Sequence, residues 1–184
     1  KTENDKTWSF WEKGSGKWES IVSKTWSKAL FYSSKKKLNL ELAPYTYKTI
    51  HALDFYTKAK QALQEKTNFD FIIEDVLSVE NSKLPMVLTA NNSYRAKHVF
   101  DSRITEDYFS ESNNFTKIIQ HFKGWIIETD VPTFNPDQFT MMDYRLKDGE
   151  QTTFTYVLPL STKKALVEFT YFTPTLVDEP TYDR

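Results

Sequence analysis

The pattern of hydrophobic and polar positions predicts a chain made mostly of β-strands, with one clear helix. Apolar residues recur on one face of a helix expected over residues 52–66. Elsewhere β-branched and aromatic residues alternate with polar ones at period two, which is typical of half-buried strands. A polar segment, residues 101–114, reads as a loop. The expected strands cover residues 21–32, 38–42, 69–79, 86–90, 95–100, 117–129, 139–146, 152–160 and 165–173.

Two short connections set an expected register for the last three strands. Asp148-Gly149 is a typical two-residue hairpin turn, which places Asp143 opposite Phe154. The four-residue loop that follows the next strand places Glu168 opposite Val157. Side chains alternate between the two faces of a sheet, so a slip of one residue would exchange the faces. Both faces are apolar, and we expect the sheet to be covered on both sides.

Composition excludes several classes of protein. The chain has only four glycines, and Gly14 and Gly16 are followed by Glu19, so it carries no G-x-G-x-x-G phosphate loop of its own. The formal net charge of -1 gives no global electrostatic footprint for nucleic acid. The absence of cysteine excludes disulfides and thiol nucleophiles, and three widely separated histidines predict no metal site.

The distribution of charged residues along the chain also bears on where the protein works in the cell. The longest stretch without a charged residue, 151–162, is too short to cross a bilayer. We therefore expect a cytoplasmic protein with at most peripheral attachment to the inner face of the membrane. The lysine run 35–37 reads as a solvated turn, with contact to anionic lipid headgroups as the alternative.

Two carboxylates stand out because they interrupt apolar strands. Glu168 lies within ALVEFTYF and Asp143 within FTMMDYR. Burying an unpaired carboxylate is costly unless it takes up a proton, which would make either group a candidate general acid. The alternatives are that Glu168 faces water or pairs with a lysine or arginine, and that Asp143 forms an ion pair with Arg145 or another base.

Aromatic residues are in excess, with 5 Trp, 10 Tyr and 14 Phe. Any one of them is best explained as core. Their number exceeds what a core needs, and this indicates a long hydrophobic cavity or a site where π faces meet a cation. Trp8, Phe10 and Trp11 lie too close together for all of them to be core of one strand, and this cluster is a candidate pocket lining.

Several segments together resemble the flavin-dependent lycopene cyclases of the bacterial type. The family's F-x-Y-x-x-P-F-S block is followed by an L-[IVL]-E-[DE]-T signature, and further motifs are M-D-x-R, T-W-S-F and F-x-G-W-x-x-E-T. The matching segments are residues 153–161, 165–170, 142–145, 7–10 and 121–129, and residues 100–103 also fit. The chain departs from the family pattern at Phe169, where many relatives have a second acid, and at Leu160, where the usual residue is Phe.

The resemblance implies a two-domain FAD-dependent flavoprotein fold of the glutathione-reductase and hydroxylase type. On this reading residues 1–103 are the remainder of the FAD-binding domain, a helix plus a β-meander. Residues 104–184 are then the substrate-binding β-sheet domain, truncated at its C-terminus. The chain starts at Lys1 without an initiator Met, so we expect the glycine-rich βαβ start to lie upstream. The residues that would bind FAD are therefore unknown, and the truncated chain itself is expected to be inactive.

The implied reaction is an acid-initiated, non-redox isomerisation that closes the acyclic ψ-ends of lycopene to β-ionone rings, although the family uses reduced FAD. By carry-over Glu168 is the essential acid, and Asp143 is a supporting carboxylate. We expect Trp8, Phe10, Tyr144 and Phe172 to bind the carotenoid. The alternatives are another FAD-dependent enzyme acting on a prenyl-lipid, such as a reductase or hydroxylase, and a non-enzymatic β-rich module that binds a hydrophobic ligand.

Overall fold

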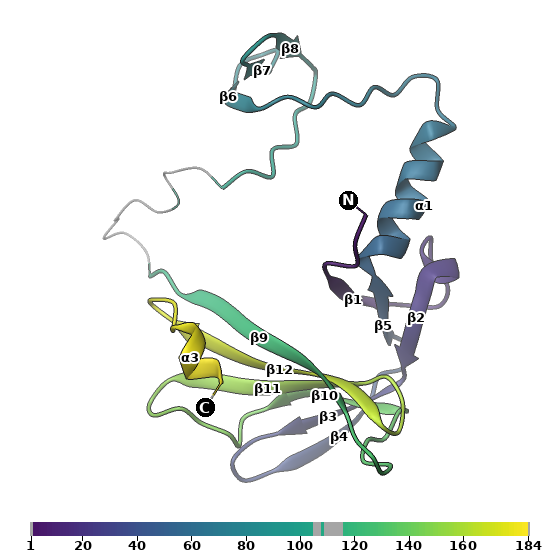
Figure 1. Ribbon diagram of the computed structural model, residues 1–184, viewed down its shortest axis with the longest axis vertical. Helices are drawn as coiled ribbons and strands as arrows, with labels where there is room; N and C mark the ends of the chain where they lie inside the picture. Colours follow the sequence, from purple (N-terminus) through teal and green to yellow (C-terminus); the bar gives the residue numbers. More distant parts are fainter. Residues whose placement is uncertain (1, 105–107, 109–115, 184) are drawn as a thin grey trace. The chain divides into compact units, whose positions relative to one another are not determined.

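The computed structural model describes residues 2–104, 108 and 116–183 and divides into two compact units (Figure 1). The first unit comprises residues 1–62 and 117–184, and the second comprises residues 63–116. This division differs from the boundary expected between residues 103 and 104. Strands from the two ends of the chain share one sheet, and local sequence pattern does not report such long-range pairing.

A three-stranded antiparallel sheet opens the first unit, with β5 between β1 and β2. These strands are β1 (Thr7–Glu12), β2 (Val22–Trp26) and β5 (Thr46–His51), and the short 3-10 turn η1 (Glu19–Ile21) precedes β2. Helix α1 (Ala52–Gln64) follows β5 directly, as the helical periodicity predicts. The ring of Trp8 packs edge-on against Phe55 and Tyr56 of α1, at centroid distances of 5.1 and 5.6 Å.

The single strand expected over residues 21–32 is wrong. It is two strands, β2 and β3 (Lys28–Tyr32), separated at Ser27 and belonging to different sheets. Trp26 and Ala29, on either side of this break, are both fully buried in the same core cluster. The alternation of apolar and polar residues is similar on both sides, so periodicity carries no sign of the change of sheet.

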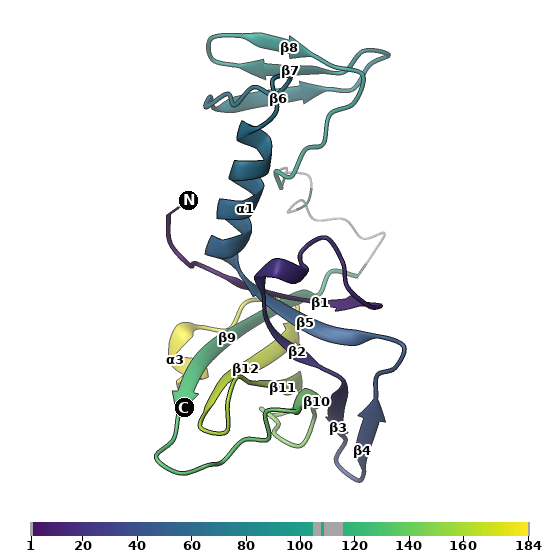
Figure 2. The ribbon, with the colours of Figure 1, turned by 90° about the vertical axis from the view of Figure 1, so that its right-hand side faces the viewer.

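The second sheet of the first unit has six strands in the order β4-β3-β10-β11-β12-β9 (Figure 2). Strands β3 and β10 pair in parallel, and the other neighbours are antiparallel. The buried side chains of Trp26, Ala29, Phe139 and Leu158 form the core. The new strands are β4 (Lys37–Glu41), β9 (Ile119–Glu128), β10 (Gln138–Asp143), β11 (Thr152–Pro159) and β12 (Lys164–Thr173).

The register of the last strands differs from the expectation. Strand β10 ends at Asp143 and β11 starts at Thr152, so Asp148-Gly149 is not a two-residue hairpin, although Gly149 does adopt a positive φ of 56°. Asp143 lies opposite Thr155, after an irregularity in the pairing of β10 with β11.

Glu168 lies opposite Tyr156, one residue away from its expected partner. This shift moves Glu168 to the face that carries Phe154 and Tyr156, because neighbours directly across a ladder share a face. The expected grouping of Glu168 with Val157 is therefore wrong. Since both faces are apolar, the sequence pattern could not discriminate between the two registers.

The second unit is a small antiparallel meander of β6 (Val76–Glu80), β7 (Met86–Thr89) and β8 (Ser93–Arg95). The strand expected over residues 69–79 is therefore present only in its last part, and the one expected over 95–100 is replaced by β8. Much of the polar loop expected over residues 101–114 lies outside the described residues. None of the described helices is long and apolar enough to cross a membrane.

Candidate functional site

A groove lies on the face of the six-stranded sheet that carries Glu168, and we call it the Glu168 groove. Its cavity volume is about 270 Å³. The wall comes from both sheets of the first unit: Trp11 and Tyr47 from the three-stranded sheet, and Phe122, Met141, Phe154, Tyr156 and Thr170 from the six-stranded sheet, together with Gln120, Met142 and Glu168 itself.

Glu168 is half-buried in this wall. Among the residues that the structure describes, its carboxyl group has no hydrogen-bond partner within 3.5 Å and no ion-pair partner within 4 Å. Burial raises the pKa of this carboxyl group, since removal from water penalises the charged form. The alternative that Glu168 pairs with a lysine or arginine is therefore not seen in the described part of the chain. The site holds a carboxyl group that retains its proton more readily than a free glutamate does.

Two tyrosine hydroxyls lie beside Glu168. Tyr156, directly across the ladder from Glu168, donates its hydroxyl hydrogen to the hydroxyl of Tyr47 at 2.8 Å. Burial is the main cause that raises the pKa of Tyr156, and its interactions with Tyr47 and Glu168 add to the rise. The phenol therefore stays neutral and supplies a polar but uncharged neighbour to the carboxyl group.

Asp143 is in a different environment. Its two carboxylate oxygens accept hydrogen bonds from Arg145 at 2.9 Å (Nε) and 2.6 Å (Nη2), and the guanidinium lies 3.9 Å from the ring centre of Tyr32. These bonds from Arg145 hold the pKa of Asp143 below its usual range. Its ladder partner Thr155 lines a cavity on the opposite face of the sheet. The structure therefore shows the ion pair that was the alternative for Asp143 and does not bring this group to Glu168.

Trp8 and Phe10 do not line the Glu168 groove. They lie opposite Ile50 and Lys48 of β5, on the side of the three-stranded sheet that packs against α1. Trp11 lies opposite Tyr47 on the other side, with ring centroids 4.7 Å apart, and it lines the groove. Because side chains alternate along β1, Trp8 and Phe10 lie on one face of the strand and Trp11 lies on the other. Their closeness in the sequence alone could not predict this.

Tyr144 and Phe172 lie at the border of the groove. Their rings pack 5.7 and 6.0 Å from the ring of Phe154, which is part of the wall. Sequence reasoning missed Tyr47 and Tyr156 as lining residues. The signal for Tyr156 was the tyrosine of the F-x-Y block, and Tyr47 carried no local signal, because it reaches the groove from another sheet.

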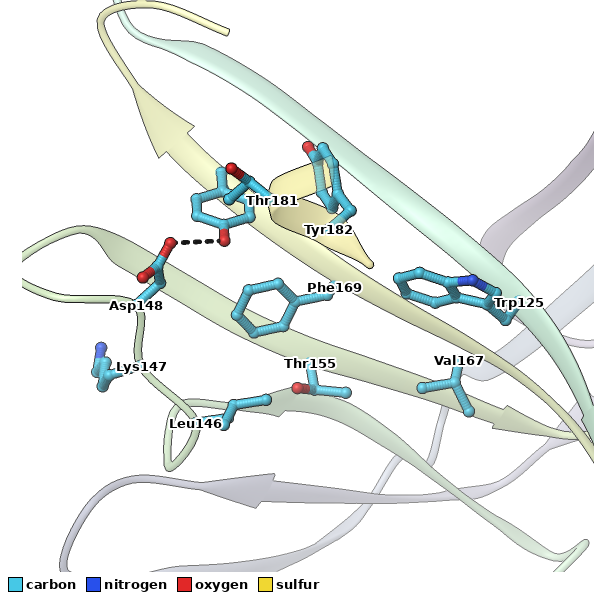
Figure 3. A pocket seen from close by; sticks show the side chains of 10 residues that line it. Trp125, Leu146, Lys147, Asp148, Thr155, Val167, Phe169, Thr181 and Tyr182 are labelled. Atoms are coloured by element: carbon cyan, nitrogen blue, oxygen red, sulfur yellow. Dashed lines mark hydrogen bonds between the residues drawn. The ribbon is translucent and has the colours of Figure 1, made fainter. Parts of the chain in front are cut away.

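A second cavity of about 420 Å³ lies on the opposite face of the six-stranded sheet (Figure 3). Its apolar wall includes Trp125, Val167 and Phe169, and its carboxylate, Asp148, accepts a hydrogen bond from the Tyr171 hydroxyl at 2.9 Å. Helix α3 (Glu179–Tyr182) borders this cavity with Thr181 and Tyr182. The acid in this larger cavity is bonded to a phenol, so we favour the Glu168 groove as the chemical site.

Helix α3 lies beside the edge strand β9 in both ribbon views (Figures 1 and 2), and side chains of the two segments contact each other. The Tyr182 hydroxyl is hydrogen-bonded to His121 Nδ1, and Lys123 Nζ lies 2.5 Å from Asp183 Oδ1. His121 Nε2 also bonds Thr173 Oγ1 at 2.8 Å, and its ring stacks on Tyr171. His121 therefore has a structural role. Among the described residues no three His, Asp or Glu side chains are grouped so that they could hold a metal ion.

The glycines nearest to a phosphate-loop spacing do not form a cradle for a dinucleotide. Gly14 and Gly16 lie in the turn between β1 and η1, where the Lys48 ammonium binds Glu12 at 2.8 Å, Glu19 at 2.5 Å and the Gly14 carbonyl at 2.7 Å. A Cβ atom on Gly16 would collide with the Glu12 carboxylate. Two carboxylates at this turn would repel a pyrophosphate, so the Gly14–Gly16 turn does not fit the diphosphate of FAD.

The two sheets and the groove define a β-dominated protein with a partly desolvated acid in a groove lined by aromatic residues. The chain belongs to the lycopene cyclase family: it matches "Lycopene cyclase protein" over residues 1–179. This confirms the resemblance seen in the sequence, and the α+β, β-dominated fold class is confirmed as well. No curated protein matches the chain.

The fold is similar to the crystal structure of a geranylgeranyl bacteriochlorophyll reductase-like protein from Thermoplasma acidophilum. The TM-score is 0.53 at 18% sequence identity, over 83% of this chain and 41% of that chain. At this identity the likeness concerns the fold alone. The chain thus spans less than half of the length of that protein.

Proposed function

We propose that the full-length protein is a lycopene β-cyclase in which Glu168 donates the proton that starts ring closure. The carboxyl proton adds to the terminal double bond of an acyclic ψ-end and leaves a tertiary carbocation. A second double bond of the same molecule attacks this cation and closes a six-membered ring. Loss of a ring proton to a base then gives the β-ionone end, so protons balance and the reaction involves no net oxidation or reduction.

The observation that carries this proposal is the unpaired, half-buried carboxyl group of Glu168. A carboxyl group can protonate an alkene only while it holds its proton, and the raised pKa favours that form. Once the proton has left, the carboxylate lies next to the cation and stabilises it. Asp143, which its arginine partner keeps ionised, cannot act as the acid in this way.

The aromatic wall supports the same chemistry. The rings of Trp11, Phe122 and Tyr156 line the groove around Glu168. Aromatic faces attract a cation, and an apolar wall excludes the water that would otherwise trap it as an alcohol. FAD, which the resemblance implies for the full-length protein, enters no step of this proposal, because the turn that contains Gly14 and Gly16 offers no cradle for it.

Carotenoids dissolve in the hydrocarbon interior of membranes. We therefore propose that the protein works in the cytoplasm in peripheral contact with the inner face of the membrane. The turn between β3 and β4, with its three consecutive lysines at 35–37, is the candidate contact with anionic headgroups.

The test is to express the full-length protein in cells that accumulate lycopene. The parent should turn the red pigment orange without a change of its mass, and Glu168→Gln should lower ring formation by a factor of at least about 100. The matched control is Glu150→Gln, which changes an exposed carboxylate in the turn before β11 and should match the parent. Pigment that stays red with the parent, or turns equally orange with Glu168→Gln, would contradict the proposal. A product that has gained hydrogen would favour the reductase alternative, and one that has gained oxygen would favour the hydroxylase.

A further inference from the structure

Gly124 of β9 lies directly across the ladder from Glu168. A Cβ atom added to Gly124 would lie 2.9 Å from Glu168 Cγ and 3.4 Å from both Glu168 Oε1 and Leu166 Cδ1. A separation of 2.9 Å between two carbon atoms is well inside van der Waals contact. The side chain of Glu168 thus occupies the space that any other residue at position 124 would need.

The backbone gives no reason for a glycine at this position. Among the glycines only Gly14 and Gly149 have a positive φ, so Gly124 has a conformation that other residues adopt freely. Glycine inside a strand is unfavourable because it restricts a flexible backbone and packs no side chain, and it often marks a close approach of another group. Its neighbours on the same face, Phe122 and Ile126, are large and exposed. The absence of a side chain at Gly124 therefore leaves a gap between them on this face of β9.

We propose that Gly124 is a positioning residue, whose missing side chain lets the Glu168 carboxyl group lie across β9 in the groove. The inference rests on the proposed function of Glu168. The position of Cγ is set by rotation about the Cα–Cβ bond alone, so a methyl group at position 124 can be avoided only by a rotation that carries the whole carboxyl group away. A substitution at Gly124 therefore acts on the acid rather than on the ligand.

Among the described residues, the side chains that line the groove around Glu168 are uncharged. They include Tyr156 of β11 with its partner Tyr47 of β5, Met141 of β10, Trp11 of β1 and Gln120 of β9. Rotation toward water restores hydration and brings the pKa of Glu168 closer to that of a free glutamate. Because activity needs the protonated form, the loss of activity at rising pH should begin at a lower pH in Gly124→Ala than in the parent.

The first test uses the full-length protein in the cyclase assay. Gly124→Ala should lower kcat about tenfold or more, with a smaller change of KM, and should shift the alkaline limb of the pH profile to lower pH. When Gly124→Ala is combined with Glu168→Gln, the double variant should have the same kcat as Glu168→Gln alone. Ile127→Ala, on the opposite face of the same strand, should keep the parent's profile. An unshifted profile with a raised KM would overturn the inference, because Gly124 would then make room for the ligand itself.

The second test does not depend on the reaction. In urea unfolding of the full-length protein, Gly124→Ala should lower the midpoint in the parent background. It should leave the midpoint unchanged or raise it in a Glu168→Ala background, where the obstructing Cγ is gone. The same destabilisation in both backgrounds would overturn the inference, even if the parent proves to be a cyclase. The expected reversal would stand even if the parent makes no rings, and only the proposed function would then fail.

Discussion

Two carboxyl groups on opposite faces of one sheet behave in opposite ways. Glu168 faces aromatic rings and neutral hydroxyls, and its pKa rises through loss of hydration. Asp143 is held by the guanidinium of Arg145 through paired hydrogen bonds, and its pKa falls. The difference lies in the partner rather than in the strand, since both carboxylates interrupt similar apolar runs. The fold therefore leaves Glu168 without a partner among the described residues, and this is the carboxyl group to which we assign the proposed proton transfer.

A third buried charge, Lys48, extends the comparison. Its side chain is almost fully buried, yet the ammonium is bonded to Glu12, Glu19 and the Gly14 carbonyl. The carboxylate bonds raise the pKa of Lys48, so this charge is stabilised in place. Both paired charges serve the structure of the first unit, and the unpaired Glu168 lies at the groove.

The largest effect on stability should follow from Lys48→Met. Its removal leaves two carboxylates facing each other without a cation and should destabilise the protein by about 2–3 kcal/mol. This is less than the cost of breaking a fully buried pair, because both acids keep access to water. Urea unfolding of the full-length protein measures it, with Lys35→Met in the exposed turn as a control. Equal midpoints for the two variants would show that the Lys48 cluster contributes nothing to stability.

Asp143→Asn should destabilise the protein less, by no more than about 1 kcal/mol, because its partner Arg145 is largely exposed. The folded state lowers the pKa of Asp143, so the pair stabilises the protein above the unfolded-state pKa, and this stability is lost as the pH falls through the folded-state value. Asp143→Asn should therefore unfold earlier than the parent at neutral pH and equally at strongly acidic pH. In the cyclase assay it should retain ring formation within about tenfold of the parent.

In the same unfolding experiment, Glu168→Gln should have the opposite effect on stability to that of Asp143→Asn. Its pKa is raised in the folded state, so the protonated form is favoured there. The charged form lowers stability as the pH rises from the unfolded-state value through the folded-state value. The variant should thus equal or exceed the parent in stability at neutral pH and lose that advantage at acidic pH. If both variants had the same pH dependence, the contrast between the two carboxyl groups would be wrong.

The smallest contrast concerns two tryptophans of β1. Trp8→Phe should lower stability by about 1 kcal/mol and leave KM for lycopene unchanged, because Trp8 packs against α1. Trp11→Phe should raise KM by a few-fold and leave stability almost unchanged, because Trp11 is half exposed and lines the groove. An exchange of these two outcomes would mean that β1 presents its other face to the ligand.

The local sequence pattern predicts where the helix and most strands lie, but it predicts less well how the strands pair and in which register. The helix after β5 and strands β9 to β12 follow from periodicity, because each buries one stripe or alternates regularly. The oddity of Glu168 was visible because a charge interrupts an apolar run. Its environment was not, since a shift of one residue in the β11–β12 loop decides which face the carboxyl group joins. Tyr47 and Gly124 lie near Glu168 but belong to other strands, and only the assembled sheets bring the three residues together.

The parallel pairing of β3 with β10 has a consequence for synthesis on the ribosome. Ala29 and Phe139 are neighbours in the sheet although 110 positions separate them in the chain. At a translation rate of about 5–20 residues per second, the β3–β4 hairpin waits roughly 5–20 s for its partner. Throughout that delay β3 exposes an unpaired edge rich in apolar residues, which is a template for association with other chains. A chaperone that covers nascent strands would thus be needed at residues 28–41 long before the segment that carries Glu168 is made.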